Sequence, residues 1–281
     1  MSVEILVGDA LDVVAALPAN SIQCVVTSPP FFGLRDYGHE RQVGGEPTVD
    51  EYARRLVAIL RECRRALRKD GTLWLELGDR HVPARPARRG DGLKPKDLFG
   101  APWTVALALR SDGWFLREEC IWHKPDATPE PITDRPTRDH STVFLLAKSA
   151  RYFYDTVAMR VPAASSANRT KTRRRAGHSI GGKTATDFPW RSADGLRKLR
   201  TVWTLPKGKS VDPVAAAFPT ALAERCIRAS SSEGDVVLDP FAGTGTVGLV
   251  ANRIGRSAVL VEINEDRARI AMERIREDVR Q

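Results

Sequence analysis

Hydrophobic positions along the chain follow two spacings, and each spacing predicts a different element. Short apolar runs are typical of buried strands, and stretches with an apolar residue every three or four positions are typical of amphipathic helices. The expected strands cover residues 4–7, 22–26, 72–77, 115–122, 142–148, 236–239 and 258–262, and the expected helices cover residues 11–17, 50–68, 102–112, 218–230, 246–254 and the stretch after about 265. This alternation predicts a parallel α/β sheet with helices on both faces.

The longest helical pattern ends at a marked stop signal. Tyr52, Leu56 and Leu60 lie on one face of the expected helix 50–68, and Lys69-Asp70-Gly71 follows it. Glycine adopts the left-handed conformation that closes many helices. We therefore expect Gly71 to be a left-handed C-cap.

The pattern is lost between about 157 and 200, where Ser, Thr, Arg and Gly dominate. Regular spacing returns after this stretch and continues to the end of the sequence. We therefore expect residues 156–202 to be an insertion that separates two parts, 1–155 and 203–281, of one α/β domain.

Charge distinguishes this insertion from the rest of the chain. The 281 residues include 44 Lys and Arg against 35 Asp and Glu, a net charge of +9. From Arg160 to Arg200 there are 11 basic and 2 acidic residues, so this stretch carries the entire excess. Such a segment suits a polyanion, most simply nucleic acid. A solvated basic loop would have the same composition, and charge alone does not separate the two.

Several classes of protein are excluded by simple patterns. No run approaches the roughly 18 apolar residues of a membrane span, and the first residues lack the basic and apolar regions of a secretory signal. The four cysteines, Cys24, Cys63, Cys120 and Cys226, are scattered without a C-x-x-C pair. We expect free thiols, neither a disulfide nor a zinc site, and a cytoplasmic protein.

The segment 239–246, with the sequence DPFAGTGT, joins an expected strand to an expected helix. Glycines in such a turn allow a ligand close to the backbone amides at the helix N-terminus. Glu262 ends the next strand, where a carboxylate can accept hydrogen bonds from ribose hydroxyls. Asp239 favours a cationic group, such as the ammonium of a methionine moiety, which favours S-adenosylmethionine over NAD. A tight turn without a ligand is the plainer alternative.

A second segment, Thr27-Ser28-Pro29-Pro30-Phe31-Phe32, follows a strand of the same expected sheet. Residues just beyond the strand ends line the ligand crevice of such sheets. The Ser28 hydroxyl, the Pro29 carbonyl and a flat Phe31 or Phe32 ring suit a planar heterocycle with an exocyclic amine. The alternative is a rigid loop with its aromatic rings packed inward.

Together the two segments resemble the amino-methylating DNA methyltransferases of the beta permuted class, in which the catalytic motif precedes the cofactor motif. Further resemblance lies in Gly8-Asp9-Ala10, Gly71-Thr72-Leu73-Trp74, residues 122–125, 134–140 and 143–149, and Phe218-Pro219-x-x-Leu222. Two positions depart from the family pattern. Ser141 stands where the family often has Glu, and Val214 stands where a histidine is common.

The resemblance implies a Rossmann-like methyltransferase sheet with an inserted basic target-recognition region, 156–202, between a catalytic part and a cofactor-binding part. It implies catalytic roles for Ser28, Pro29, Pro30 and Phe31. It implies S-adenosylmethionine contacts from Asp9, Ala10, Phe218, Asp239, Phe241, Gly243, Thr244 and Glu262. The arginines and lysine expected to contact DNA are Arg173, Arg174, Arg175, Arg191, Arg197, Lys198 and Arg200.

The implied reaction is methyl transfer to the exocyclic amine of a flipped base in double-stranded DNA. Ser28 at the start of the loop is typical of cytosine-N4 members, whereas adenine-N6 members more often carry Asp. An adenine-N6 enzyme is thus the first alternative. A dinucleotide-dependent oxidoreductase, on the pattern Gly243-x-Gly245-x-x-Gly248, and an inactive DNA-binding protein are more remote.

The resemblance also bears on partners and on the histidines. A restriction endonuclease acting on the same site and a second copy of the chain are the expected partners, with no membrane, in a bacterial, archaeal or phage-encoded system. His123 and His140 are interpreted as polar rim residues, and we assign no metal. Cys24 and Trp203 are interpreted as core and packing residues.

Overall fold

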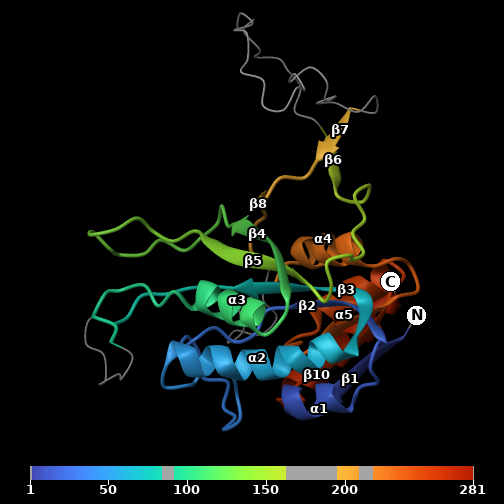
Figure 1. Cartoon of the computed structure of the whole chain (residues 1–281), viewed down its shortest axis with the longest axis horizontal. Coiled ribbons are helices and arrows are strands. Elements are labelled where there is room, and N and C mark those ends of the chain that lie inside the picture. Colours follow the sequence, from blue (N-terminus) through green and yellow to red (C-terminus); the bar gives the residue numbers. More distant parts are fainter. Residues whose placement is uncertain (1, 84–91, 163–194, 209–217, 281) are drawn as a thin grey trace, which may run out of the picture.

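The computed structural model of the chain describes residues 2–83, 92–162, 195–208 and 218–280 (Figure 1). Its strands are β1 Val3–Val7, β2 Ile22–Thr27, β3 Leu67–Leu77, β4 Phe115–His123, β5 His140–Ala147, β6 Arg160–Pro162, β7 Leu196–Lys198, β8 Val202–Thr204, β9 Val236–Asp239 and β10 Ser257–Glu262. Its helices are α1 Ala10–Ala16, α2 Val49–Ala66, α3 Ala101–Ser111, α4 Thr220–Ser230, α5 Thr246–Arg253 and α6 Glu265–Val279. All the strands and helices expected from the pattern are present. Their ends differ from expectation by at most two residues, except that β3 begins five residues earlier than the expected strand 72–77.

Eight strands form one sheet in the order β1-β10-β9-β2-β3-β5-β4-β8. Neighbours from β1 to β3 are parallel, and β8 is parallel to β4. β5 is antiparallel to both β3 and β4, so the expectation of a parallel sheet is wrong at this strand. The connection from β4 to β5 contains no helix that could return the chain to the starting edge of the sheet, which is why the strand reverses.

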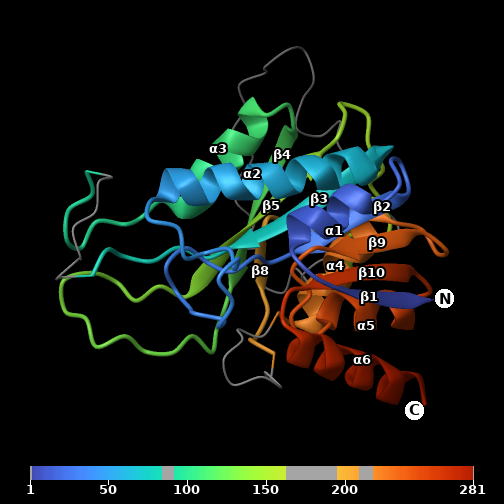
Figure 2. The same ribbon diagram turned by 90° about the horizontal axis from the view of Figure 1, so that it is seen from below.

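Helices cover both faces of the sheet, as expected. Figure 2 shows α1, α2 and α3 along one face and α5 and α6 along the other, where α4 also packs. Alternate residues of one strand enter different cores: Val25 of β2 packs with α2 and α3, whereas Cys24 packs with α4 and α5. This alternation is the two-residue period of a strand buried on both faces.

Gly71 is not a helix cap, contrary to expectation. α2 ends at Ala66 with Leu67 as its C-cap, and Gly71 lies inside β3. A Cβ atom on Gly71 would lie 2.8 Å from Leu67 Cδ2 and 3.0 Å from the Gln23 carbonyl oxygen. The glycine is required by close packing against β2 rather than by a left-handed conformation.

The basic stretch contains regular structure at its two ends. β6 and β7 pair antiparallel, with Arg160 opposite Lys198, and this ribbon projects away from the main sheet in Figure 1. β8 then joins the edge strand β4, and the expected boundary at 202/203 falls inside it. Arg173, Arg174, Arg175 and Arg191 lie outside the described residues.

The buried cysteines and tryptophans occupy the positions expected of core residues. Cys24 is fully buried, which raises the pKa of its thiol to about 12, and all four cysteines are free. Trp203 is 3% exposed and packs with its ring centroid 5.6 Å from that of Trp74. Among the helices that the structure describes, none is long and apolar enough to cross a membrane.

Candidate active site

One cavity lies where parallel strands end at a common edge of the sheet. Gly8 follows β1, Ser28 follows β2, and Asp239 and Glu262 close β9 and β10. The cavity is lined by every residue expected to be catalytic or to bind the cofactor: Asp9, Ala10, Ser28, Pro29, Pro30, Phe31, Phe218, Asp239, Phe241, Gly243, Thr244 and Glu262. Segments more than 200 residues apart in sequence therefore meet in one place, as the rule for open α/β sheets predicts.

The glycine turn and Glu262 hold each other in position. Gly243 has φ +53° and Gly245, the N-cap of α5, has φ +78°, a region that glycine enters without strain. Glu262 Oε2 accepts a hydrogen bond from Gly243 N at 2.8 Å, and Oε1 accepts one from Asn264 N at 3.0 Å. Burial raises the pKa of Glu262, and these amides act in the opposite direction. The result is a fixed carboxylate at the cavity wall.

Asp239 is the more strongly perturbed acid. It is 4% exposed, and its Oδ1 accepts hydrogen bonds from Thr27 Oγ1 at 2.7 Å and from Phe241 N at 3.1 Å. Burial raises the pKa of Asp239 to about 7, and the negative charge of Glu262 adds to the effect. A ligand cation beside Asp239 would relieve this cost.

Asp9, by contrast, is compensated by the protein itself. Its Oδ1 caps α1 by accepting a hydrogen bond from Leu11 N at 2.9 Å. Its Oδ2 lies 3.4 Å from an Arg41 nitrogen and 3.8 Å from an Arg55 nitrogen. Asp9 therefore has less need of a ligand cation than Asp239.

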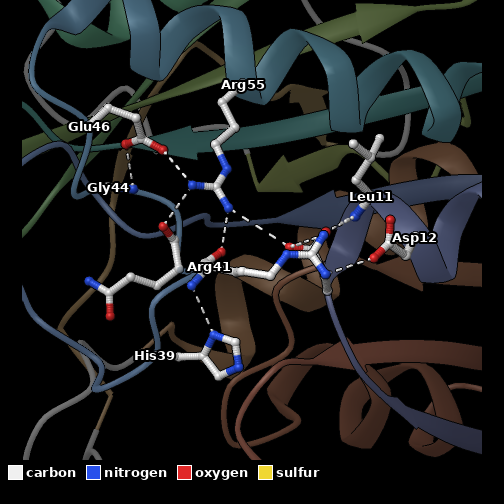
Figure 3. Close-up of polar contacts among 9 residues, drawn as sticks. Leu11, Asp12, His39, Arg41, Gly44, Glu46 and Arg55 are labelled. Carbon is white, nitrogen blue, oxygen red and sulfur yellow. Dashed lines mark hydrogen bonds and ion pairs between the residues drawn. The ribbon is translucent and has the colours of Figure 1, made fainter.

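The loop between β2 and α2, residues 28–48, forms one wall of the cavity. The sequence analysis identified its first residues, up to Phe32, and missed the rest. Arg41 bridges to Asp12 at 2.9 Å, and Arg55 holds the loop by contacts to the Gln42 carbonyl at 3.0 Å and to Glu46 at 3.3 Å (Figure 3). Arg35, Tyr37, Arg41 and Gln42 line the cavity, as does Arg267 of α6. No motif marks these residues, although a run of polar side chains between a strand end and a helix was a usable signal.

The structure assigns the two phenylalanines to different places. Phe32 is buried, 5.6 Å from the Tyr52 ring and 5.0 Å from the Phe99 ring, whereas Phe31 lines the cavity. Phe31 packs closely on the backbone of Gly78, where a Cβ atom would clash with the Phe31 ring. Of these two phenylalanines, only Phe31 can therefore present its ring to a ligand in the cavity.

Two contacts fix the polar groups of the same loop. The Tyr52 hydroxyl donates to the Pro30 carbonyl at 2.9 Å. The Ser28 hydroxyl donates to Glu76 Oε2 at 2.5 Å. A hydroxyl has one hydrogen and two lone pairs, so this bond leaves the Ser28 lone pairs available to accept.

Glu76 is a site residue that the sequence pattern concealed. It lies within β3, is 2% exposed, and has its pKa raised by burial and lowered by Lys124, Ser28 and Ser141. An acid in a strand of otherwise apolar residues, Leu73-Trp74-Leu75-Glu76-Leu77, was the available signal.

The remaining candidates lie outside the cavity. Arg197, Lys198 and Arg200 lie on or next to the β6–β7 ribbon. His123 Nδ1 is 3.1 Å from Thr204 Oγ1, and both His123 and His140 contact Asp139 at the surface. Within the described ranges, no group of His, Cys, Asp and Glu could hold a metal ion.

The cavity offers groups for each part of one kind of molecule. Glu262 suits a ribose diol, Asp239 an ammonium, and the arginines of the loop and of α6 a carboxylate. Phe218 and Phe241 offer apolar contact for a purine ring. This donor set fits S-adenosylmethionine.

Comparison with known proteins agrees with this chemistry. A family model described as DNA methylase, for N6 and N4 methyltransferases, matches residues 22–273. The chain is 42% identical to the type II methyltransferase M.XycI of Xanthomonas campestris pv. cyanopsidis, over 95% of this chain and 86% of that protein. It is 39% identical to M.SmaI of Serratia marcescens, over 98% of this chain and 91% of that protein.

Solved structures resemble the fold along the whole chain. The Thermus thermophilus protein TTHA0409, solved in complex with S-adenosyl-L-methionine, matches with a TM-score of 0.66 and 30% identity over 99% of this chain and 94% of that one. The PvuII DNA methyltransferase, described as cytosine-N4-specific, matches with a TM-score of 0.68 and 19% identity over 100% of this chain and 92% of that one, a likeness of fold. S-adenosylmethionine is therefore the cofactor, and the chain belongs to the N6/N4 DNA methylase family.

Proposed function

We propose that this chain is a type II, cytosine-N4-specific DNA methyltransferase. The observation that carries the proposal is Ser28, held by Glu76 at the wall of the cofactor cavity with its lone pairs free to accept. The relatives M.XycI and M.SmaI are named type II methyltransferases, which supports action on a specific DNA site. Membership of the DNA methylase family argues against the two remote alternatives, a dinucleotide-dependent oxidoreductase and an inactive DNA-binding protein.

The exocyclic amine of a base is a poor nucleophile because its lone pair is delocalised into the ring. Ser28 Oγ and the Pro29 carbonyl accept hydrogen bonds from the two N–H groups, which favours tetrahedral geometry at the nitrogen and localises its lone pair for attack on the methyl group. Phe31 stacks on the base and fixes its plane. S-adenosylmethionine would supply the electrophilic methyl group and leave as the thioether S-adenosylhomocysteine, while the methylated amine would lose one of its protons. Ordering of the two centres by the protein is worth up to about 7–11 kcal/mol.

The cavity residues divide into those for the cofactor and those for the base. We propose that Glu262 binds the ribose and Asp239 the ammonium, with Asp9, Ala10, Phe218, Phe241, Gly243 and Thr244 completing the cofactor surface. The target base is extruded from the duplex to reach Ser28. Residues 156–202 recognise the target sequence, with Arg197, Lys198 and Arg200 at the base of that region contacting DNA.

The choice of cytosine over adenine rests on Ser28 at the first position of the loop, by resemblance. The test is nucleoside analysis of host DNA, with and without expression of the chain, together with sequencing that detects modified bases. N4-methylcytosine at one repeated sequence is expected. N6-methyladenine would support the adenine alternative, and unmodified DNA would contradict the proposed function.

The same reasoning extends to partners. A restriction endonuclease that cleaves the methylated sequence when it is unmodified is the proposed functional partner, because type II methyltransferases such as those this chain resembles protect DNA from one. A homodimer rests on family resemblance and stays a prediction. Both are tested once the recognition sequence is known, by the susceptibility of that sequence to cleavage and by sedimentation of the protein.

The first prediction concerns Glu262. Replacing it by Ala is expected to weaken S-adenosylmethionine binding by about 1–3 kcal/mol, because charge-assisted hydrogen bonds to the ribose are lost. Calorimetric titration measures the dissociation constant. Glu265→Ala, in the exposed first turn of α6, is the matched control and should bind normally. An unchanged dissociation constant in Glu262→Ala would reject the assignment.

The second prediction concerns pH. Burial raises the pKa of Asp239 to about 7, so both its protonated and its ionised forms are populated in the free protein near neutrality. Protonation of Asp239 stabilises the folded, ligand-free protein. This stabilisation is complete at pH values below the ordinary pKa of an aspartate and is lost as pH rises through about 7. Binding of a cationic ligand favours the ionised form. S-adenosylmethionine is therefore expected to bind more tightly as pH rises from about 6 to 8, with proton release.

Calorimetry over this pH range, in buffers of different ionisation enthalpy, measures both effects. The amino group of the ligand titrates with an ordinary pKa of about 7.7–8.0, so a variant must isolate the protein's part. In Asp239→Asn the pH dependence of the dissociation constant should flatten. The same dependence in wild type and Asp239→Asn would show that Asp239 does not bind the ammonium.

A further inference from the structure

Three side chains lie behind Ser28 on the same face of the sheet. Glu76 is near the end of β3, Ser141 is near the start of β5, and Lys124 directly follows β4. These segments lie side by side, with Trp122 of β4 in register with Ser141. Glu76 follows Trp74 by two residues, Lys124 follows Trp122 by two and Ser141 precedes Val143 by two, and all three apolar neighbours belong to the core on the α4 side. The pleat therefore directs the three polar side chains to that face.

Two hydrogen bonds, from Lys124 to Ser141 and from Ser28 to Glu76, flank a pair, Ser141 and Glu76, whose side chains interact electrostatically. The Lys124 ammonium donates to Ser141 Oγ and lies 4.1 Å from the centre of the Trp122 ring. Ser141 is 2% exposed, and because its oxygen accepts from Lys124, its own hydrogen is available for Glu76. Glu76 Oε2 accepts from Ser28, whereas Oε1 is buried with no hydrogen-bond partner among the described residues.

We propose that Lys124, acting through Ser141, is a positioning residue for methyl transfer that keeps Glu76 ionised, so that Glu76 holds the Ser28 hydrogen and the Ser28 lone pairs face the base amine. The proposal rests on the proposed function. It also gives a role to Ser141, one of the two positions at which this chain departs from the family pattern. Because position 141 is Ser and not the Glu common in the family, Glu76 is the carboxylate of this group of side chains. The charge of Lys124 therefore acts on Glu76, the residue that holds Ser28.

The electrostatics of the pair agree with this role. Burial raises the pKa of Glu76, and Lys124 is the largest influence in the opposite direction. Burial lowers the pKa of Lys124, and Glu76 is the largest influence in the opposite direction. Asp126, Arg138 and Lys207 also act on Lys124, and Tyr52 lies close enough to sense the charge of Glu76. His123 and His140, which contact Asp139, lie one residue out of phase with Lys124 and Ser141 along their strands.

The test compares Lys124→Met with Lys124→Arg. Single-turnover transfer from tritiated S-adenosylmethionine to unmodified genomic DNA is followed against pH at saturating cofactor, which removes the effect of Asp239 on binding. Lys124→Met is expected to lower the rate about tenfold to a hundredfold, the usual loss for a hydrogen bond to a charged group. Glu76 without its cation needs a higher pH to ionise, so the acidic limb of the profile should move to higher pH. Lys124→Arg should restore the limb towards its wild-type position.

Two further variants separate this role from a structural one. Glu76→Gln should lose the acidic limb, and adding Lys124→Met to it should cost little more, because both act through one group. Ser141→Ala should move the limb in the same direction with little change in packing, and it carries the test if Lys124→Met does not fold. Lys148→Met is the matched control, a half-buried lysine at the opposite end of β5 that donates to Asn20 and to the Leu67 carbonyl.

The outcomes are distinct. A wild-type pH profile in folded Lys124→Met or Ser141→Ala, or additive losses for Lys124→Met and Glu76→Gln, would overturn the inference. A displaced acidic limb in Lys148→Met as well would also overturn it, because the effect would not be specific to Lys124. Absence of methyl transfer by the wild-type protein on any DNA would instead contradict the proposed function.

Discussion

Replacing Ser28 by alanine is expected to lower the rate of methyl transfer by about a hundredfold or more, while S-adenosylmethionine binds as before. Ser28 Oγ donates to Glu76 at 2.5 Å and so offers its lone pairs to the base amine, where positive charge develops during the reaction. Removal of one such preorganised polar group typically costs about 100- to 1000-fold in rate. The cofactor contacts assigned to Glu262 and Asp239 do not involve this hydroxyl.

Single-turnover kinetics and calorimetric titration separate the two quantities. Ser21→Ala serves as the matched control, since its hydroxyl donates to the Pro18 carbonyl at the other end of β2. The control should keep both its rate and its affinity. An alanine variant at 28 with the full rate of transfer would remove Ser28 from the mechanism, and an equal loss of affinity would place it in the cofactor site instead.

The ends of the parallel strands were the part of the site that sequence could predict. Each motif stands next to a recognisable strand, so the rule for open α/β sheets brings Ser28, Asp239 and Glu262 to one edge without further information. Local sequence was enough to predict the roles of these residues and the glycine turn. Their meeting in one cavity follows from topology alone.

Strand direction and packing needs were less visible. The run that forms β5 has the same apolar character as its parallel neighbours, and hydrophobicity carries no direction, so the reversal at β5 required tertiary structure. Gly71 matched the composition of a helix C-cap, yet the 3.0 Å that would separate its Cβ from the Gln23 carbonyl explains the glycine by close approach of two strands. Composition cannot distinguish these two needs for a glycine.

Residues that complete the site from neighbouring elements were missed for a related reason. Glu76 contacts Ser28 from β3, and Lys124, which we propose to act on Glu76, follows β4. Neither has a spacing in sequence that links it to the loop. Arg41 lines the cavity and forms an ion pair with Asp9. Arg55 forms an ion pair with Glu46, which Figure 3 shows. Contacts of this kind are specified by the register of the sheet and by the path of a loop.

Binding of DNA is expected to become much less sensitive to salt when Arg173, Arg174 and Arg175 are all replaced by alanine. These residues lie outside the described part of the chain, within the basic stretch that carries the whole net charge. Each phosphate contact releases counterions and contributes about −0.9 to the slope of log affinity against log salt concentration. Loss of up to three contacts should therefore flatten the slope by about two to three units.

The control is a variant with the same loss of charge elsewhere, Arg269, Arg276 and Arg280 to alanine at the exposed end of the chain around α6. Both variants lose three positive charges, and only the position of the loss differs. The control should keep the wild-type slope, because its arginines are not expected to contact phosphate. Titrations use a duplex with the sequence found methylated in the host and a scrambled duplex. If the three arginines contact only phosphate, the triple variant should lose the same affinity for both duplexes. If one of them reads a guanine edge, the difference in binding free energy between the two duplexes should also fall by about 1–3 kcal/mol. An unchanged slope for both duplexes would identify the arginine run as a solvated loop, and S-adenosylmethionine affinity should stay at the wild-type value throughout.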